Sequence, residues 1–263
     1  MKLKADFSTF GGIAIALLGI GGGLALEGGK LSQVFQPTAA LIVLGGTLGA
    51  VMIHFPFPVI VRAIVQLKEI FSSAVPEPDH LVRDLLRYAY KARKEGILSL
   101  DPELARIRDP FLKESLMLAI DGMGADEIRK QMDFQLDYQS EIDERVPKVF
   151  DTAGGIAPTI GIVGAVLGLI QTMQHLQDIN QVGNGIAVAF VATIYGVGAA
   201  NLLFLPFAGK LRLRLRERQM IQEITLEAVL AIADGVSPRN LEKQLSGYLG
   251  APLRPRLKKV VNL

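Results

Sequence analysis

The chain contains four long stretches without a charged residue, and the polar side chains inside them are the groups that could do chemistry. The stretches run over residues 9–26, 31–61, 152–177 and 179–209. The hydroxyl, amide and imidazole groups expected inside the membrane belong to Thr38, Thr47, His54, Thr159, Gln171, Thr172, Thr193, Tyr195 and Asn201. Because no stretch holds Asp, Glu, Lys or Arg, the chain lacks the buried ionisable group that ion relays normally use. An ion that crosses here must therefore use a carrier group from another chain.

The elements that must position these groups are membrane-spanning helices. A spanning helix needs about 20 apolar residues, and each charge-free stretch is long enough for one. Half of the chain is apolar and its mean hydropathy is positive. The first stretch follows Lys2 and Lys4 as a secretory signal would, but "LALEGG" offers no clear small-x-small cleavage site, so we expect a retained helix. The sequence predicts an all-α membrane protein with four spans, and the absence of cysteine excludes disulfides and thiol chemistry.

The basic residues predict the topology. Lys30 is the only basic residue in the two short connections, which follow the first and third spans, whereas every other junction is basic. The positive-inside bias then places both termini and the long middle region in the cytoplasm. The basic run at 210–218 directly follows a span, so we expect it to meet membrane lipid headgroups and no nucleic acid.

Four regions follow from this topology. Residues 1–61 hold spans one and two, residues 62–148 a cytoplasmic helical region, residues 149–209 spans three and four, and residues 210–263 a cytoplasmic helical tail. "FPFP" at 55–58 should end the second span and begin an interfacial helix. Helices are then expected after Asp79, Asp101 and Asp109, and a last helix should run from about Ala125 into span three. The middle region carries 14 basic and 17 acidic residues, so it can offer both signs of charge to a partner.

Small residues and prolines distinguish the spans. Gly45 and Gly49, and also Gly164 and Gly168 with Gly161, form small-xxx-small patterns that let helices approach closely, either within the chain or between subunits. Pro158 and Pro206 lie near the cytoplasmic ends of spans three and four. They could be tolerated kinks, or a pair of hinges at one depth.

These features together resemble one known family. "APTIGIVGAVLGLIQTM" in span three, "AVAFVATIYGVGAANLLFLPFAGKL" in span four, "LIVLGGTLGAVMI" in span two and "GADEIRKQM" in the loop are similar to the MotA/PomA stator subunits of the flagellar motor, within the MotA/TolQ/ExbB superfamily. The resemblance covers nearly the whole chain. It implies a pentameric ring in the bacterial inner membrane around a dimer of a MotB-type partner, whose single membrane helix supplies the missing aspartate.

The resemblance also implies roles for particular residues. Pro158 and Pro206 match the family's functional prolines, and Thr193 matches the threonine that faces the partner's aspartate. In the loop, Arg93, Asp101 and the nearby Glu103 take the place of the charges that meet the rotor protein FliG. Thr193 could instead bond its own helix, and Asp101 could also cap a helix.

The identity of the ion rests on departures from the family pattern. Ala165 and Ala192 stand where sodium-type members tend to carry threonine, which removes oxygen ligands and favours protons over sodium as the transported ion. Gly155 stands where several members have an acid, and Asp151 could substitute for it or cap a helix. We expect no cofactor, no bound metal and no enzymatic activity.

Three other classes remain as alternatives. The related ExbB/TolQ energisers of outer-membrane processes have three spans, whereas four are expected here. A channel working alone would need its own intramembrane charged group. A passive membrane scaffold would explain the glycines and the charged loop, but not the coincidence of prolines, threonine and loop charges with stator positions.

Overall fold

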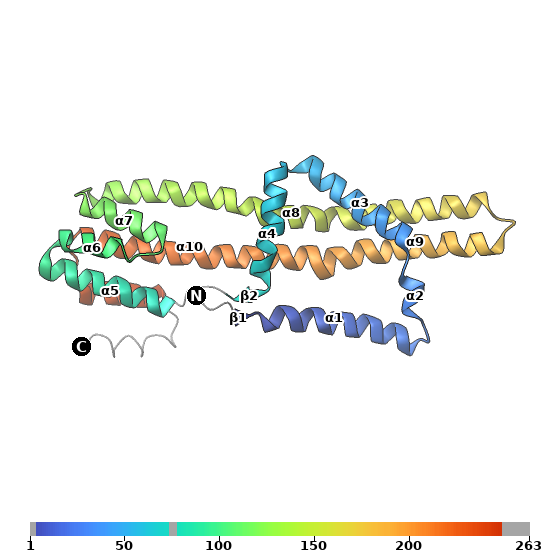
Figure 1. Cartoon of the computed structure of the whole chain (residues 1–263), viewed down its shortest axis with the longest axis horizontal. Coiled ribbons are helices and arrows are strands. Elements are labelled where there is room, and N and C mark those ends of the chain that lie inside the picture. Colours follow the sequence, from blue (N-terminus) through green and yellow to red (C-terminus); the bar gives the residue numbers. More distant parts are fainter. Residues whose placement is uncertain (1–3, 74–77, 249–263) are drawn as a thin grey trace. The chain divides into compact units, whose positions relative to one another are not determined.

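The computed structural model describes residues 4–73 and 78–248, which are mostly helical (Figure 1). These residues divide into two compact units, one formed by 4–73 with 143–213 and the other by 78–142 with 214–248. Two long helices, α8 (Ala125–Gln174) and α10 (Leu205–Ala233), supply residues to both units. Residues 249–263 of the predicted tail, like Lys2, lie outside the described residues.

The first unit holds the apolar helices. Besides parts of α8 and α10 it contains β1 (Lys4–Ala5), α1 (Phe7–Leu26), α2 (Leu31–Val34), α3 (Pro37–His54), α4 (Phe57–Ile70), β2 (Ser72–Ser73), α9 (Ile179–Ala199) and the π-helical η2 (Ala200–Phe204). Within the described ranges, four helical segments are long and apolar enough to cross a membrane, which confirms the predicted spans. They are α1, α3, α8 and the continuous segment from α9 into α10. The antiparallel pair of β1 with β2, two residues long, is a small departure from the all-α prediction.

The starts and ends of these helices follow from local sequence. The Asp6 carboxylate accepts hydrogen bonds from the backbone of Ser8 and Thr9, which caps the start of α1. Pro37 begins α3, where a missing N–H costs nothing. The "FPFP" segment ends α3 at His54 and starts α4 at Phe57, which confirms a break followed by a separate helix. Figure 1 shows α4 running across α8 and α10.

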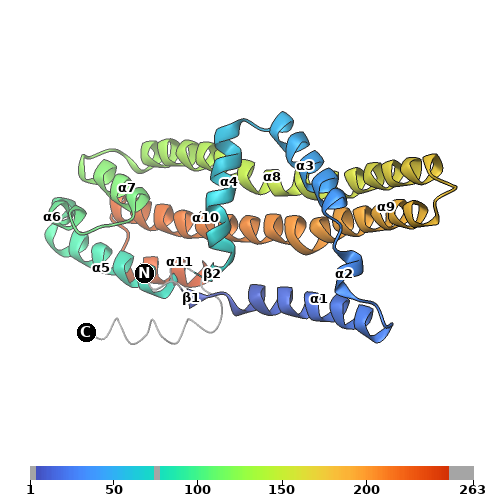
Figure 2. The same cartoon turned by 45° about the vertical axis from the view of Figure 1, so that its right-hand side comes forward.

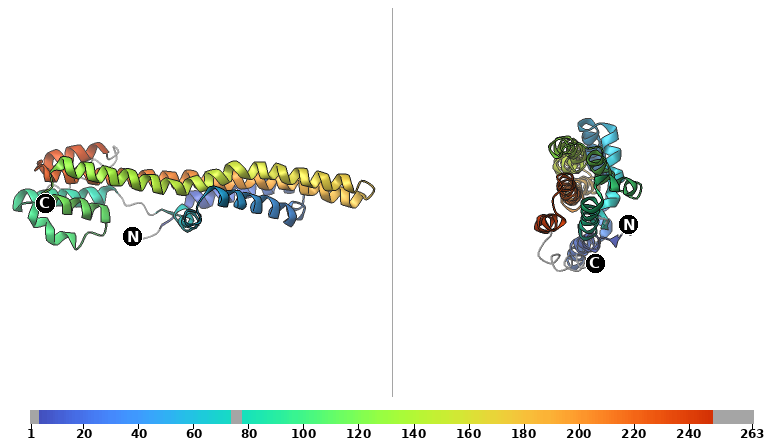
Figure 3. Two further views of the ribbon diagram at one scale, coloured as in Figure 1. Left: turned by 90° about the horizontal axis from the view of Figure 1, so that it is seen from above. Right: turned by 90° about the vertical axis from the view of Figure 1, so that its left-hand side faces the viewer.

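Three helices form the packed part of this unit. The second half of α8 and α9 lie side by side, antiparallel, and are joined by a short turn after Gln174 (Figures 1 and 3). α3 packs on α9, and this contact buries Ala39, Val43, Val188, Val191 and Ala192. From α9 the chain passes through η2 into α10 without a break, so the helical tail begins as a continuation of span four.

α1 is attached differently. None of its residues 7–26, all of which are described, is buried. A mostly apolar cavity of about 850 Å³ separates it from α3, α9 and α10, and Figures 1 and 2 both show the helix standing apart. At one end Asp6 pairs with Lys210, and the Thr9 hydroxyl donates to the Ile70 carbonyl at 3.2 Å. At the other end the Tyr195 hydroxyl donates to the Val34 carbonyl at 2.7 Å.

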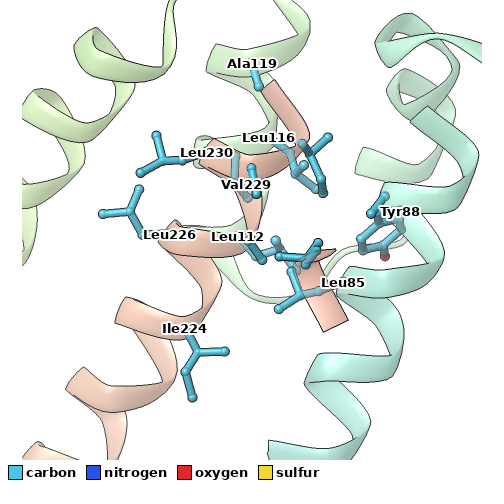
Figure 4. Packing of buried hydrophobic residues seen from close by; sticks show 14 of the residues in the cluster. Leu85, Tyr88, Leu112, Leu116, Ala119, Ile224, Leu226, Val229 and Leu230 are labelled. Carbon is cyan, nitrogen blue, oxygen red and sulfur yellow. The ribbon is translucent and has the colours of Figure 1, made fainter. Parts of the chain in front are cut away.

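The second unit is a helical bundle with its own core. It contains α5 (Pro78–Glu95), the 3₁₀ turn η1 (Ile97–Leu100), α6 (Asp101–Leu104), α7 (Pro110–Ile120) and α11 (Pro238–Tyr248), with the remaining parts of α8 and α10. Figure 4 shows apolar side chains of α5, α7 and α10 gathered in this core, among them Leu85, Leu112 and Val229. Asp109 caps α7 through the Leu112 amide at 2.9 Å, and α8 runs from Ala125 into the third span, both as predicted.

Candidate functional site

The contact between α8 and α9 brings two backbones unusually close. A Cβ atom added at Gly168 would lie 2.7 Å from the Gly185 carbonyl oxygen, and one at Gly196 would lie 2.5 Å from the Ala157 carbonyl oxygen. A Cβ at Gly161 would lie 2.9 Å from the Ala192 carbonyl oxygen. Such distances exclude any side chain without movement of the backbone. The glycines are therefore needed for this helix pair.

The structure separates the predicted glycine patterns into two groups. Gly161 and Gly168 contact α9, and Gly164 faces Ala192 and Ile42. All three therefore lie in contacts within the chain. Gly45 and Gly49 meet nothing within 4 Å among the described residues. On α3 it is Gly46 that makes the close contact, since a Cβ there would lie 2.8 Å from the Ile160 side chain.

The two prolines act on their helices in different ways. α8 continues as an α-helix through Pro158. Pro206 follows the π-helical segment η2, in which the Leu205 amide donates to the Ala200 carbonyl five residues earlier. Proline has no N–H, so the helix cannot close its ordinary bond at 206, and a π segment is one way to absorb the mismatch.

A side-chain contact connects the two proline turns. A Cβ atom added at Gly154 would lie 2.7 Å from Cγ and Cδ2 of Leu205. Gly154 lies one turn before Pro158, and Leu205 directly precedes Pro206. The two prolines therefore lie within about one or two helical turns of this contact, which is close enough for a paired hinge.

Thr193 lies beside the α8–α9 contact and is half-buried. Its hydroxyl is 3.3 Å from the Ala189 carbonyl of its own helix, which is the local bond considered as the alternative to an ion-binding role. A Cβ added at Gly161 would lie 3.5 Å from the Thr193 Cα, so the threonine backbone is close to α8. At 3.3 Å the bond to Ala189 is a long hydrogen bond for a hydroxyl donor.

The two alanines of the expected ion path are placed differently from each other. Ala192 is fully buried, and a Cβ at Gly164 would lie 2.8 Å from its Cβ, so its side chain belongs to the core between helices. Ala165 is half-buried on α8. The side chain of Ala192 is therefore buried in the core, whereas that of its neighbour Thr193 is half-exposed.

Asp151 lies inside α8 and is paired with Arg212 of α10, so a helix-capping role is wrong for it. A second ion pair joins Arg62 of α4 to Asp143 of α8. Both pairs tie elements of the first unit together where the apolar part of α8 begins. Gly155, the position of the missing acid, faces open space among the described residues.

The predicted rotor-contact charges lie on either side of the turn that follows α5. Gly96, with φ of +84°, turns the chain from α5 into η1 and α6. Arg93 is exposed, and its Nη1 donates to the Gly235 carbonyl at 3.1 Å, at the end of α10. Asp101 is exposed as well, but Leu100 is the N-cap of α6 and no side-chain capping bond forms in this described segment, so the expected cap by Asp101 is wrong.

Glu103 is held more tightly than its neighbours. Its side chain is 17% exposed, accepts from Lys91 Nζ at 2.7 Å and lies 4.0 Å from Arg106. The hydrogen bond from Lys91 is the main cause that lowers the pKa of Glu103 below its ordinary value. Of the three predicted contact residues, Arg93 and Asp101 are the accessible ones.

Sequence reasoning missed four features of the site. The ion pair of Asp6 with Lys210 and that of Asp151 with Arg212 join residues far apart in the chain. The contact of Gly154 with Leu205 is equally remote. The π segment had one signal, Pro206 inside an apolar helix, and this indicated a kink without specifying how the backbone accommodates it.

Residues 10–96 match the family described as Motility protein A N-terminal, and residues 103–224 match the MotA/TolQ/ExbB proton channel family. Motility protein A of Bacillus subtilis (strain 168) is 33% identical over 254 residues, which cover 96% of this chain and 93% of that protein.

Solved structures agree with these matches. A chain in the structure of C. jejuni MotAB aligns with a TM-score of 0.88 at 31% identity, covering 94% of this chain and 96% of that chain. A chain in the flagellar MotAB stator complex from Bacillus subtilis aligns with a TM-score of 0.87 at 32% identity, covering 95% and 98%.

Proposed function

The chain belongs to the Motility protein A family, within the MotA/TolQ/ExbB proton channel family, and we infer from this membership that it is a stator subunit of the flagellar motor. The observation that carries this conclusion is the full-length likeness to a chain of the flagellar MotAB stator complex, with a TM-score of 0.87 over 95% of the chain. The match of residues 10–96 to the Motility protein A N-terminal family favours a stator subunit over an ExbB/TolQ energiser.

The subunit works with a MotB-type partner. The solved relatives are MotAB complexes, which supports such a partner here. The spans carry no ionisable group of their own, so the partner's membrane aspartate supplies the ion carrier. The assembled complex is a pentameric ring of this chain around the partner, in the bacterial inner membrane, with both termini in the cytoplasm.

Ion binding becomes movement at the α8–α9 pair. When an ion neutralises the partner's aspartate, the cost of holding its charge in the membrane disappears and a different set of ring contacts becomes favourable. Thr193 gives the aspartate a hydroxyl partner, and Pro158 and Pro206 allow the two helices to bend together. The ion is a proton, because the half-buried Ala165 offers no oxygen ligand to sodium.

The movement is delivered to the rotor protein FliG through the second unit. Arg93 and Asp101 are exposed and carry opposite charges on neighbouring turns, which suits a partner surface that carries both signs. Glu103 has a positioning role, since its bond to Lys91 fixes α6 against α5. Exposed charges mainly guide the encounter of two partners and fix how their surfaces align. Single changes here should therefore weaken torque without dissociating the stator complex.

Complementation of a host that lacks its own stator tests this function. The chain and its MotB-type partner should together restore swimming, in sodium-free medium as well as in sodium medium. Thr193→Val should abolish swimming while the ring still assembles, and Thr193→Ser should retain it. Failure of the wild-type pair to restore swimming would overturn the stator function, and swimming by Thr193→Val in both media would overturn the role of Thr193.

The rotor contact has a separate test. Arg93→Glu should reduce swimming, and an opposite charge reversal on FliG should recover part of the loss. Lys94→Glu, on the neighbouring exposed residue of α5, is the matched control for a general effect of charge. Equal defects in both variants, or no defect in Arg93→Glu, would exclude a specific contact by Arg93.

A further inference from the structure

The contact between Gly154 and Leu205 joins the two backbone sites that the prolines have altered. Pro158 has no N–H, and the carbonyl that loses its α-helical donor as a result is that of Gly154, four residues earlier. Leu205 is the residue whose amide makes the π-type bond to Ala200, directly before Pro206. The side chain of Leu205 then occupies the space that a Cβ at Gly154 would need.

This arrangement can respond as a unit. If the π segment became α-helical, the helix beyond it would shift by one residue and turn by about 100°, because one residue of an α-helix covers that angle. Such a change would carry the Leu205 side chain away from Gly154. The contact therefore exists only with the π form of η2. It links the conformation of η2 to the turn of α8 that lacks a hydrogen bond because of Pro158.

We propose that Gly154 and Leu205 are positioning residues that couple bending of α8 at Pro158 to the π segment before Pro206, so that α8 and α10 change conformation together. The proposal rests on the stator function inferred above and specifies how its two hinges are linked. Neither residue touches the ion. Their contact sets the balance between two forms of the ring, and by linkage any change in that balance alters the apparent affinity for the ion.

The chain offers a well-matched pair of variants. In Gly154→Ala the new methyl group meets Cγ and Cδ2 of Leu205, and both atoms move when this side chain turns about its χ1 bond, so the helices can remain folded while the contact changes. In Gly209→Ala the methyl group enters open space on α10, four residues after Leu205. Leu205→Ala removes the contact from the other side, and the double variant Gly154→Ala with Leu205→Ala returns a small group to the site.

The measurement is swimming speed of complemented cells as a function of external pH and, separately, of sodium concentration, with ring assembly checked by the size of the purified complex. We expect Gly154→Ala to shift the ion concentration for half-maximal speed by roughly fivefold, or about 0.7 pH unit for a proton, at the low end of couplings between sites. The Gly209→Ala variant should keep the wild-type midpoint, and the double variant should lie closer to wild type than either single variant. A structural defect alone would lower the maximal speed and leave the midpoint unchanged.

The outcomes separate the proposal from the function on which it rests. No swimming with the wild-type pair would reject the stator function. With a swimming wild type, equal midpoints for Gly154→Ala and Gly209→Ala would reject the coupling, and so would additive effects in the double variant.

Discussion

Two glycine-rich apolar parts of the first unit are held in opposite ways. On α8 and α9, Gly161, Gly168 and Gly196 each lie where a Cβ would come within 3.0 Å of a backbone atom. On α1, the six glycines at 11, 12, 19 and 21–23 meet nothing within 4 Å among the described residues. The first region is stabilised along its length by backbone contact, whereas the second is attached by polar groups at its ends.

This difference shows that composition alone does not reveal what a glycine contributes. In α8 and α9 glycine permits a close approach that packing energy then stabilises. In α1 glycine only lowers the helix propensity. This helix is attached by Asp6 at one end and, at the other, by the bond of Tyr195 to Val34 in the segment between α1 and α3. Substitutions should therefore have large effects in one region and small effects in the other.

The largest effect is expected at Gly196. Gly196→Ala places a methyl group 2.5 Å from the Ala157 carbonyl oxygen and 3.1 Å from the Gly161 Cα, both backbone atoms that cannot step aside. We expect α8 and α9 to separate, with a loss of about 2–3 kcal/mol in the free energy of unfolding. Titration of the purified complex with SDS, followed by circular dichroism, measures this loss. Gly198→Ala, two residues along in open space, should unfold like wild type, and equal losses in both variants would remove the distinction between the two regions.

The positions of the spans could be predicted, but the identity of the contacting glycines could not. Long charge-free stretches become helices because lipid leaves no other way to satisfy the backbone, so the four spans follow directly from the sequence. The small-xxx-small pattern occurs on more than one face of these helices. Gly45 and Gly49 fit it as well as Gly164 and Gly168 do, yet only the latter pair meets α9, because the rotation of α3 is set by contacts with Ile160 and Val191.

Local signals at helix ends were more reliable than signals between elements. Asp109 caps α7 as predicted, since a cap needs only its own next turn. Asp101 fails as a cap because the preceding η1 already continues the helical path into α6. Asp151 pairs with Arg212, a residue 61 positions away, and no local pattern predicts that partner.

The next largest effect is expected at the Asp6 end of α1. Asp6→Ala removes both the helix cap and the ion pair with Lys210, whereas Asp6→Asn can keep the cap. The cap alone is worth about 1 kcal/mol. Loss of these groups should release the Asp6 amide from the Phe71 carbonyl, which hydrogen exchange at that amide detects. Asp6→Ala should exchange fastest and Asp6→Asn at an intermediate rate, and unchanged exchange in both would mean that α1 is not attached here.

Acidic pH should produce the same release. The hydrogen bond from Lys210 lowers the pKa of Asp6 below its ordinary value. A carboxylate whose pKa is lowered in the folded state stabilises the fold at pH above its ordinary value, near 4, and this contribution is lost as the pH falls through the lowered pKa. Exchange of the Asp6 amide in wild type, corrected for the intrinsic rate, should therefore rise below about pH 4, and that rise should be absent in Asp6→Asn.

A smaller effect is expected at the opposite end. Tyr195→Phe removes the hydroxyl that donates to the Val34 carbonyl at 2.7 Å and accepts from the Gln36 amide at 3.2 Å. The free energy of unfolding should fall by about 1 kcal/mol, the usual net value of one or two neutral hydrogen bonds. Faster hydrogen exchange at the Gln36 amide, with unchanged exchange in α9, would support a local role of Tyr195 in holding residues 34–36. Slower swimming without faster exchange would instead assign the hydroxyl to ion coupling.

The smallest effect is expected within α1 itself. Gly22→Ala adds a methyl group with no neighbour within 4 Å and replaces a poor helix former by a good one, so the free energy of unfolding should stay unchanged or rise by less than about 1 kcal/mol. The SDS titration used for Gly196→Ala measures both variants on one scale. A destabilisation by Gly22→Ala in the assembled ring, but not in the dissociated subunit, would show that another chain packs against this face. The open glycines of α1 would then belong to the same class as those of α8 and α9, with their contacts made between subunits.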